Sequence, residues 1–562
     1  MSFPSPEQED VIRAAIEHRS SALVIAGPGA GKSRTALEIA KRFLECIPEN
    51  EKVLFLSFSN AAIRRLSEAS GTDNARTARR RLVFATYHSL AAEVLASYGQ
   101  FAGLPGKTKV IDNLEERFVA IENGWDDSDK TGYRKSIFDH ARNTGEMGFR
   151  TLVPLAAALL KASATLTRAY FRRFSLIVVD EFQDTSKDQW ELLKVVGENK
   201  QVLAFGDPNQ IIYASLHEAT AERLKEFEDW KGVKQVALPA VSHRCKEDEI
   251  LNFATCLLTG KAYNRPEGKS AVEIVAMFYD QLFATLGAYC LQFLSKTKNA
   301  KLGMLVPRNK LADEIVFRLR NPNPEGQVRT PVYARLPQDQ TAIESVQLAL
   351  AAVLDYAENP DPYTLRTTAV ALCTMNSLWN HQAGTSPQNV EEIERCFTST
   401  RMKKNSLAQL PKTVRNAGAT TRDQFRALVD FLQDKAIFDS AVRRIQQNYP
   451  SKIPEIPENK PGSTLFDALR AARKPKGLEG EEAGNNRIQV LTYQKSKGRE
   501  FDFTIMVVDK YAESSGIPLE EKRRLYYVCA TRAKKKLSVF YFGAARMGNV
   551  LGPALSPAYR DE

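Results

Sequence analysis

The segment from Ala26 to Ser33, AGPGAGKS, carries residue types suited to binding phosphate groups. It lies between a short apolar run and a segment with helical spacing, so that loop amides and a helix N-terminus would face one ligand. Lys32 would neutralise the β- and γ-phosphate oxygens, and the Ser33 hydroxyl would reach Mg²⁺. The strict motif has glycine where Ala26 stands, but three other glycines keep the loop free to turn. A glycine-rich turn without a ligand is the alternative, and the strand–loop–helix context argues against it.

Two carboxylates end the apolar run within LIVVDEFQDT, residues 176–185. Asp180 is suited to hold Mg²⁺ through water or Ser33, and Glu181 is suited to polarise the water that attacks a γ-phosphate. A strand end followed by a capped helix would explain one acid, but the phosphate loop makes a shared role of both the better explanation. After the next apolar run, Gln210 of GDPNQ is a candidate γ-phosphate sensor, although this pentapeptide alone is a generic turn.

The elements that position these residues alternate between short apolar runs and helical segments, a pattern that predicts parallel α/β sheets. We expect one series of strands at residues 21–27, 53–58, 82–87, 175–180 and 201–206, and a second at 272–277, 302–307, 331–336, 487–493, 503–509 and 536–541. Residues 97–167 and 345–480 have mainly helical patterns. The expected fold class is therefore α/β, with two parallel-sheet domains that each carry a mainly helical insertion.

The chain has 562 residues, of which 43% are hydrophobic and 26% charged, as in a folded protein of several domains. The sequence contains no run of the roughly 18 apolar residues that a membrane span needs. The acidic N-terminus is unlike a signal peptide. Seven scattered cysteines without CxxC spacing predict a cytoplasmic location and argue against structural zinc.

Positive charge is concentrated in one part of the chain. The formal net charge is +11, and residues 401–476 contain 16 Lys and Arg against 7 Asp and Glu. Such a block predicts a polyanionic partner, most simply nucleic acid. A solvated face of an ordinary helical domain explains the charge equally well.

Nine motifs, in order along residues 8 to 533, resemble those of the UvrD/Rep branch of superfamily 1 DNA helicases. They are Gln8, AGPGAGKSR, FLSFSNAAIRRL, TYHSL, VVDEFQDT, GDPNQIIY, SHR, TYQKSKGREFD and EEKRRLYYVCATRA. Each motif is weak alone, whereas the ordered series is specific. The resemblance implies two RecA-like P-loop motor domains with ATP bound between them. It predicts the first motor domain at 1–96 and 168–240 with its insertion at 97–167, and the second at 241–344 and 481–562 with a basic insertion at 345–480.

The resemblance also implies a role for each matching residue. Catalysis would involve Lys32, Glu181, Gln210, Arg244 and Arg532. The metal would be held by Ser33 and Asp180. The nucleotide would be bound by Gln8, Ala26, Gly27, Pro28, Gly29, Ala30, Gly31, Lys32, Ser33, Arg34, His243, Gly498 and Glu500. Single-stranded DNA would meet Phe58, Asn60, Tyr87, His88 and Tyr213, since aromatic faces stack on bases.

The implied function is an ATP- and Mg²⁺-dependent helicase or translocase that moves 3′ to 5′ on single-stranded DNA and unwinds duplex at junctions between single and double strands. The chain departs from the family where His243 replaces the usual Tyr, where Gln494 replaces a frequent His, and where YASLHEA lacks an aromatic residue. These departures leave a second hypothesis open: a DNA-sensing regulatory ATPase that works with a separate nuclease, for example in bacterial antiviral defence. Repair, replication, recombination and defence are all compatible with the sequence.

Overall fold

The computed structural model describes residues 4–57, 81–125, 129–212, 222–239, 245, 248–264, 266–268, 271–320, 332, 334, 340–380, 387–398, 409–417, 421–434, 464–473, 487–509, 516–542 and 550–554. Contacts divide the chain into two compact units. Unit 1 comprises Met1–Val94, Val153–Pro337 and Glu479–Glu562, and unit 2 comprises Leu95–Leu152 and Gln338–Leu478. We describe each unit by itself.

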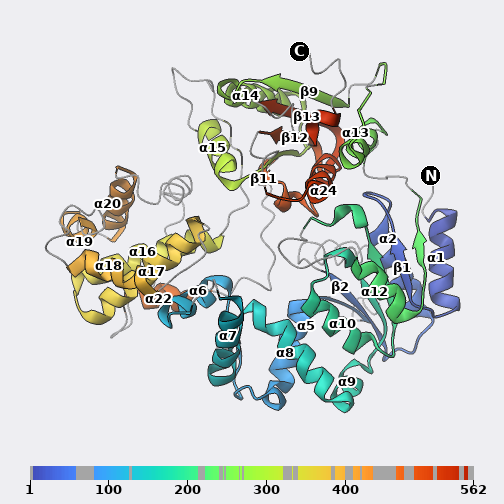
Figure 1. The fold of residues 1–562 in the computed structure, drawn as a ribbon, viewed down its shortest axis with the longest axis horizontal. Helices are drawn as coiled ribbons and strands as arrows, with labels where there is room; N and C mark the ends of the chain where they lie inside the picture. Colours follow the sequence, from blue (N-terminus) through green and yellow to red (C-terminus); the bar gives the residue numbers. More distant parts are fainter. Residues whose placement is uncertain are drawn as a thin grey trace. The chain divides into compact units, whose positions relative to one another are not determined.

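Unit 1 contains two parallel sheets, each at the centre of one lobe (Figure 1). The first lobe, within residues 4–94 and 153–239, has a sheet in the order β3-β2-β6-β7-β1-β8. Its strands are β1 Ala22–Ile25, β2 Lys52–Ser57, β3 Leu82–Thr86, β6 Phe174–Val179, β7 Gln201–Gly206 and β8 Gln235–Ala237. Because every pairing is parallel, the carboxyl ends of all strands lie at one edge, where α/β proteins bind their ligands.

Helices α1 and α2 pack against this sheet through apolar side chains that include Ile12, Ile39 and Phe43. Helix α1 begins with a capping box between Ser5 and Gln8, because each side chain binds the backbone amide of the other residue. The helices of the first lobe are α1 Pro6–Glu17, α2 Lys32–Glu45, α5 Tyr87–Tyr98, α8 Phe149–Ala162, α9 Ala164–Phe171, α10 Lys187–Gly197 and α12 Glu222–Lys231. Helices α5 and α8 each continue across the division between the units.

The second lobe, within residues 245–320 and 487–554, has a parallel sheet in the order β11-β10-β12-β13-β9. Its strands are β9 Val272–Met277, β10 Leu302–Val306, β11 Ile488–Thr492, β12 Phe501–Val508 and β13 Ala533–Phe542. Helices α13 Asp248–Thr259, α24 Leu519–Ala530 and α25 Leu551–Ala554 contribute to the apolar core on one face. Helices α14 Tyr279–Lys296 and α15 Asn309–Arg320 contribute to the core on the other face.

Unit 2 is mainly helical and combines two stretches that are far apart in the sequence. Its helices are α6 Asn113–Glu122, α7 Lys130–Thr144, α16 Gln340–Glu358, α17 Pro362–Asn380, α18 Pro387–Thr398, α19 Leu410–Arg415, α20 Thr421–Asp434 and α22 Leu465–Ala472, with a parallel pair of short strands, β4 Lys109–Val110 and β5 Glu146–Met147. The ring of Phe118 on α6 lies 5.6 Å from that of Phe466 on α22, in an edge-to-face contact. Residues of both predicted insertions therefore share one core. The bounds of the four domains expected from the sequence remain a prediction.

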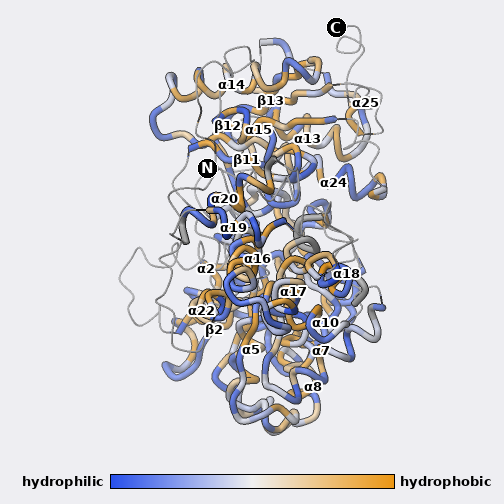
Figure 2. Tube along the Cα trace, turned by 90° about the vertical axis from the view of Figure 1, so that its left-hand side faces the viewer, coloured by the Kyte–Doolittle hydropathy of each residue, from blue (hydrophilic) through white to orange (hydrophobic). Residues whose placement is uncertain are grey.

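Hydrophobic strands and amphipathic helices account for these elements. Figure 2 shows hydrophobic and hydrophilic stretches alternating along helices such as α17 and α18. The ends of the expected strands are confirmed within three residues, except for the strand at 331–336, most of which lies outside the described residues. Among the described helices, no single one is long and apolar enough to cross a membrane, and α8 with α9 reaches that length only as a pair bent by 109°.

Candidate functional site

The phosphate loop begins where β1 ends and stops at the first turn of α2. The amide of Ala26 donates to the Gly206 carbonyl at the end of β7, which fixes the start of the loop to the sheet. Gly29 and Gly31 have φ angles of 80° and 85°, which side chains with a Cβ rarely adopt. Because Gly31 is also the N-cap of α2, the first amides of this helix point into the loop, where an anion would sit.

Lys32 is the charged group of this loop and is only 7% exposed. Its Nζ donates to the carbonyl oxygens of Ala26 at 2.6 Å and Gly27 at 3.2 Å, and lies 3.9 Å from Oδ2 of Asp207. The ammonium group is thus held against the loop at the carboxyl edge of the first sheet. This is the position from which it would neutralise phosphate oxygens.

Ser33 and Asp180 join the loop to the end of β6. The Ser33 hydroxyl donates to Oδ2 of Asp180 at 2.9 Å, although 147 positions separate the two residues. A hydroxyl and a carboxylate are hard oxygen donors of the kind that Mg²⁺ takes together with substrate phosphates. The pair therefore fits the metal role expected for both residues. No cluster of three or more His, Cys, Asp or Glu suited to a metal was found in the described part of the chain.

Glu181 has a strained backbone next to this pair. Its φ is 52°, in the left-handed region, a conformation that costs a non-glycine residue about 1–2 kcal/mol. Gln183 donates from Nε2 to Oε2 of Glu181 at 2.7 Å, and accepts at Oε1 from the Asp207 amide at 3.0 Å. Strain held in place by specific contacts is typical of functional positions.

The two adjacent carboxylates have different proton affinities. Burial raises the pKa of Asp180, and the neighbouring Glu181 charge raises it further. Burial also acts on Glu181, but the ammonium groups of Lys32 and Lys497 outweigh it and lower the pKa of Glu181. Of the two carboxylates, Glu181 therefore keeps its charge to the lower pH.

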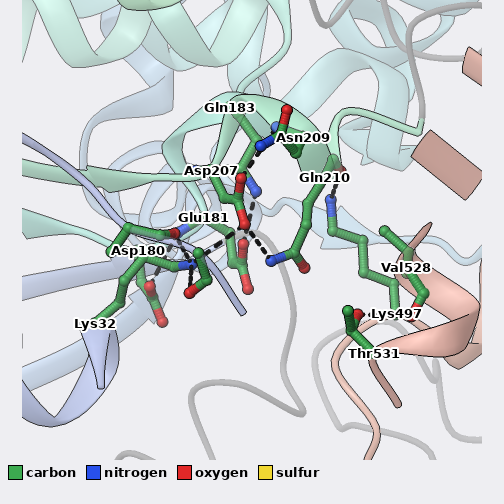
Figure 3. A network of polar contacts seen from close by, with 12 residues as sticks. Lys32, Asp180, Glu181, Gln183, Asp207, Asn209, Gln210, Lys497, Val528 and Thr531 are labelled. Carbon is green, nitrogen blue, oxygen red and sulfur yellow. Dashed lines mark hydrogen bonds and ion pairs between the residues drawn. The ribbon is translucent and has the colours of Figure 1, made fainter. Parts of the chain in front are cut away.

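Gln210 connects the two lobes. Its Nε2 donates to Oδ2 of Asp207 at 2.7 Å (Figure 3). Its Oε1 accepts from Nη2 of Arg532 at 3.3 Å. Arg532 is 1% exposed and is anchored by a 2.8 Å bond from Nε to the Val528 carbonyl on α24. The guanidinium from the second lobe and the phosphate loop of the first are thus linked through one glutamine and one aspartate.

Lys497 makes a second connection between the lobes, which the sequence analysis missed. Its Nζ donates to the backbone carbonyl of Gln210 at 2.5 Å (Figure 3). The same Nζ donates to Asp184 at 2.7 Å. The side chains of Lys497 and Asp184 are 7% and 2% exposed. Asp184 lies inside the motif VVDEFQDT and Lys497 inside TYQKSKGREFD, both quoted above. Their place in these motifs is the sequence signal from which they could have been predicted.

Four further nucleotide candidates lie on three segments of the chain. Gln8 donates from Nε2 to the Ala30 carbonyl at 3.1 Å, which ties α1 to the phosphate loop. Gly498 has a φ of 76° in the loop after β11, and Oε2 of Glu500 lies 3.0 Å from Nζ of Lys534. Arg34 is exposed on α2. His243 and Arg244 lie outside the described residues.

The DNA candidates are less well supported. Tyr87 is 2% exposed at the start of α5, among the buried residues of the first lobe, and its stacking on a base stays a prediction. His88 beside it is half-buried. Phe58, Asn60 and Tyr213 lie outside the described residues.

Comparison with known proteins finds similarity to proteins named as DNA helicases. Residues 8–216 match a family model described as an AAA domain, and residues 488–540 match the UvrD-like helicase C-terminal domain. The chain is 23% identical to a putative ATP-dependent DNA helicase, YjcD, of Bacillus subtilis, over 95% of this chain and 79% of the relative. It is 23% identical to DNA helicase II of Haemophilus influenzae, over 93% of this chain and 82% of the relative. The match to ATP-dependent DNA helicase Rep of Escherichia coli is 24% identical and spans about a third of each protein, 34%.

Proposed function

The chain is UvrD/Rep-like, and from that premise we propose that it is an ATP-dependent DNA helicase that moves 3′ to 5′ on single-stranded DNA. One observation carries the proposal. Lys32, Asp180 and Glu181 of the first lobe and Arg532 of the second are linked through one set of polar contacts at the carboxyl edge of the first sheet.

The residues have distinct parts in hydrolysis. Loop amides and Lys32 bind the phosphates, and Glu181 orients the attacking water. Ser33 and Asp180, together with the phosphates, would hold Mg²⁺, which would supply charge neutralisation and phosphate orientation. Arg532 stabilises the charge that spreads over the transferring oxygens, and this stabilisation requires the two lobes to be close.

The polar contacts between the lobes can couple ATP hydrolysis to movement of the lobes. Gln210 is held by Asp207 of the first lobe and contacts Arg532 and Lys497 of the second. A change at the γ-phosphate that moves Gln210 would therefore alter contacts of both lobes. Opening and closing of the lobes in each ATP cycle would then advance a bound strand.

Strand displacement by the purified chain tests the proposal. The substrates are duplexes with a 3′ or a 5′ single-stranded tail, and the variant is Lys32→Ala. Lys41→Ala, on the same helix α2 but away from the loop, is the matched control. We expect wild type and Lys41→Ala to displace the strand of the 3′-tailed duplex but not that of the 5′-tailed duplex. Lys32→Ala should displace neither. Displacement by Lys32→Ala, or of the 5′-tailed duplex alone, would contradict the proposal.

The second hypothesis, a DNA-sensing ATPase that serves a separate nuclease, predicts a different result in the same assay. DNA would stimulate ATP hydrolysis, but neither duplex would be displaced. The names of the relatives support the helicase, and none of those reported above names a nuclease partner.

A further inference from the structure

A basic groove lies at the edge of the first sheet opposite the phosphate loop. Its volume is about 1000 Å³, and its lining includes Phe171 and Arg172, which precede β6, and Asn199 and Lys200, which precede β7. These residues stand at the amino ends of the strands, whereas the phosphate loop follows the carboxyl end of β1. A six-residue strand spans about 20 Å, so the groove is separate from the nucleotide site.

The charge of the groove is strongly one-sided. Its lining contains two carboxylates, Glu191 and Glu198, and five cations: Lys161, Arg168, Arg172, Lys194 and Lys200. Lys194 is paired with Glu191 at 2.7 Å. Lys161, Arg168 and Arg172 are exposed, and no described residue forms a hydrogen bond or ion pair with the side chain of any of them. Three unpaired like charges in one groove repel each other, and an anionic ligand would offset that repulsion.

The groove has a well-packed wall. The Nζ of Lys231 donates to the carbonyls of Gly197 at 2.5 Å and Lys200 at 3.1 Å, so it caps the end of α10. It also lies 4.0 Å from the centre of the Trp230 ring, which lines the groove. A Cβ on Gly197 would lie 2.8 Å from that ring, so this contact requires glycine. The neighbouring helices α9 and α10 are labelled in Figure 1.

We propose that this groove binds the phosphodiester backbone of nucleic acid, as a second contact outside the motor's own strand path. Arginine forks match phosphate oxygens in pairs, and two of the three unpaired cations are arginines. The choice of nucleic acid as the anion rests on the proposed function. The groove contains none of the residues assigned to ATP.

The test compares two triple variants of the full chain that lose the same charge. Lys161→Gln/Arg168→Gln/Arg172→Gln changes the groove. Lys296→Gln/Lys298→Gln/Lys301→Gln is the matched control, because these lysines are exposed and lie before β10, at the amino edge of the second sheet. The probes are a fluorescein-labelled single strand and a labelled blunt duplex, and Kd is measured by anisotropy between 50 and 200 mM salt. Melting temperature and ATPase rate without DNA serve as checks of folding, and both should match the wild type.

We expect the groove variant to bind at least one probe more weakly than the control variant. Each lost phosphate contact lowers the slope of log K against log salt by about 0.9 on a duplex and about 0.7 on a single strand. Three contacts would therefore lower the slope by about 3 or about 2. The probe that loses slope identifies the form of nucleic acid bound.

Equal slopes for the groove and control variants on both probes would overturn the inference. The strand-displacement result is independent, since it depends on Lys32. A wild-type chain that displaces no strand but binds DNA through the groove would refute the proposed function alone. A chain that unwinds with an unaltered salt slope would refute the groove alone.

Discussion

Replacing Lys497 with Met tests whether the second lobe controls hydrolysis through a buried ion pair. The change keeps an apolar chain of similar length but removes the donor to Asp184 and to the Gln210 carbonyl. A hydrogen bond to a charged group contributes about 1.5–3 kcal/mol. If that amount is lost from the closed state, kcat of the DNA-stimulated ATPase falls roughly 10- to 100-fold. Because Lys32 and its loop remain intact, ATP binding should change little.

A second substitution separates positioning from general damage. Lys497→Met leaves the Asp184 carboxylate buried without its partner. Breaking a buried pair in this way lowers the free energy of unfolding by about 3–5 kcal/mol. Adding Asp184→Asn removes that charge, so the double variant should recover part of the lost kcat. Lys495→Met, two positions away in the same short turn, is the matched control and should behave as wild type.

The assay is steady-state ATPase with saturating single-stranded DNA, combined with a fluorescent ATP analogue to follow binding. A double variant whose loss equals the product of the two single losses would refute the coupling argument. So would a Lys497→Met chain that matches Lys495→Met. A large loss of nucleotide binding would mean that Lys497 supports the loop and not the closed state.

Three other substitutions, at Glu181, Asp184 and Arg473, also have expected outcomes. Glu181→Gln should bind ATP but hydrolyse it about 10²- to 10⁴-fold more slowly, measured as single-turnover phosphate release; failure to bind ATP would contradict its role. Burial raises the pKa of Asp184 to about 6 despite Lys497. The folded state therefore binds more protons than the unfolded state between about pH 4 and 6, and the free energy of unfolding should fall as pH rises through that range. Melting curves of Asp184→Asn should lack the part of the pH dependence that comes from Asp184. A pH dependence identical to that of the wild type would refute this assignment. In unit 2, Arg473 contacts Asp112 at 2.6 Å and Glu344 at 2.9 Å, so Arg473→Met should destabilise unit 2 by about 3–5 kcal/mol, seen as loss of hydrogen-exchange protection in α6 and α16.

The strands and the phosphate loop were predictable because their signals are local. An apolar run followed by glycines identifies β1 and its loop, and the helix expected after the loop is α2, Lys32–Glu45. The short strand β8, Gln235–Ala237, was missed because all three residues are exposed and carry no burial pattern. Its position depends on pairing with β1, which the local sequence does not encode.

Contacts between distant segments were not predictable. Lys497 and Asp184 are 313 positions apart, and no spacing rule joins them. Tyr87 matched a DNA-binding motif, but its burial depends on what packs over α5. The shared core of unit 2 likewise depends on Leu114 and Phe118 of α6 meeting α16, α17 and α22.

The strand order of the second lobe has a consequence for synthesis on the ribosome. Strands β9 and β10 are made first but are not neighbours; β12 and β13 lie between them in the sheet. After Val306, more than two hundred residues must be made before β13 ends at Phe542, roughly 10 to 50 s at usual elongation rates. During that interval the edges of β9 and β10 lack their partners, while most of unit 2 emerges. The nascent second lobe therefore exposes unpaired strand edges for tens of seconds, a state that chaperones protect from aggregation.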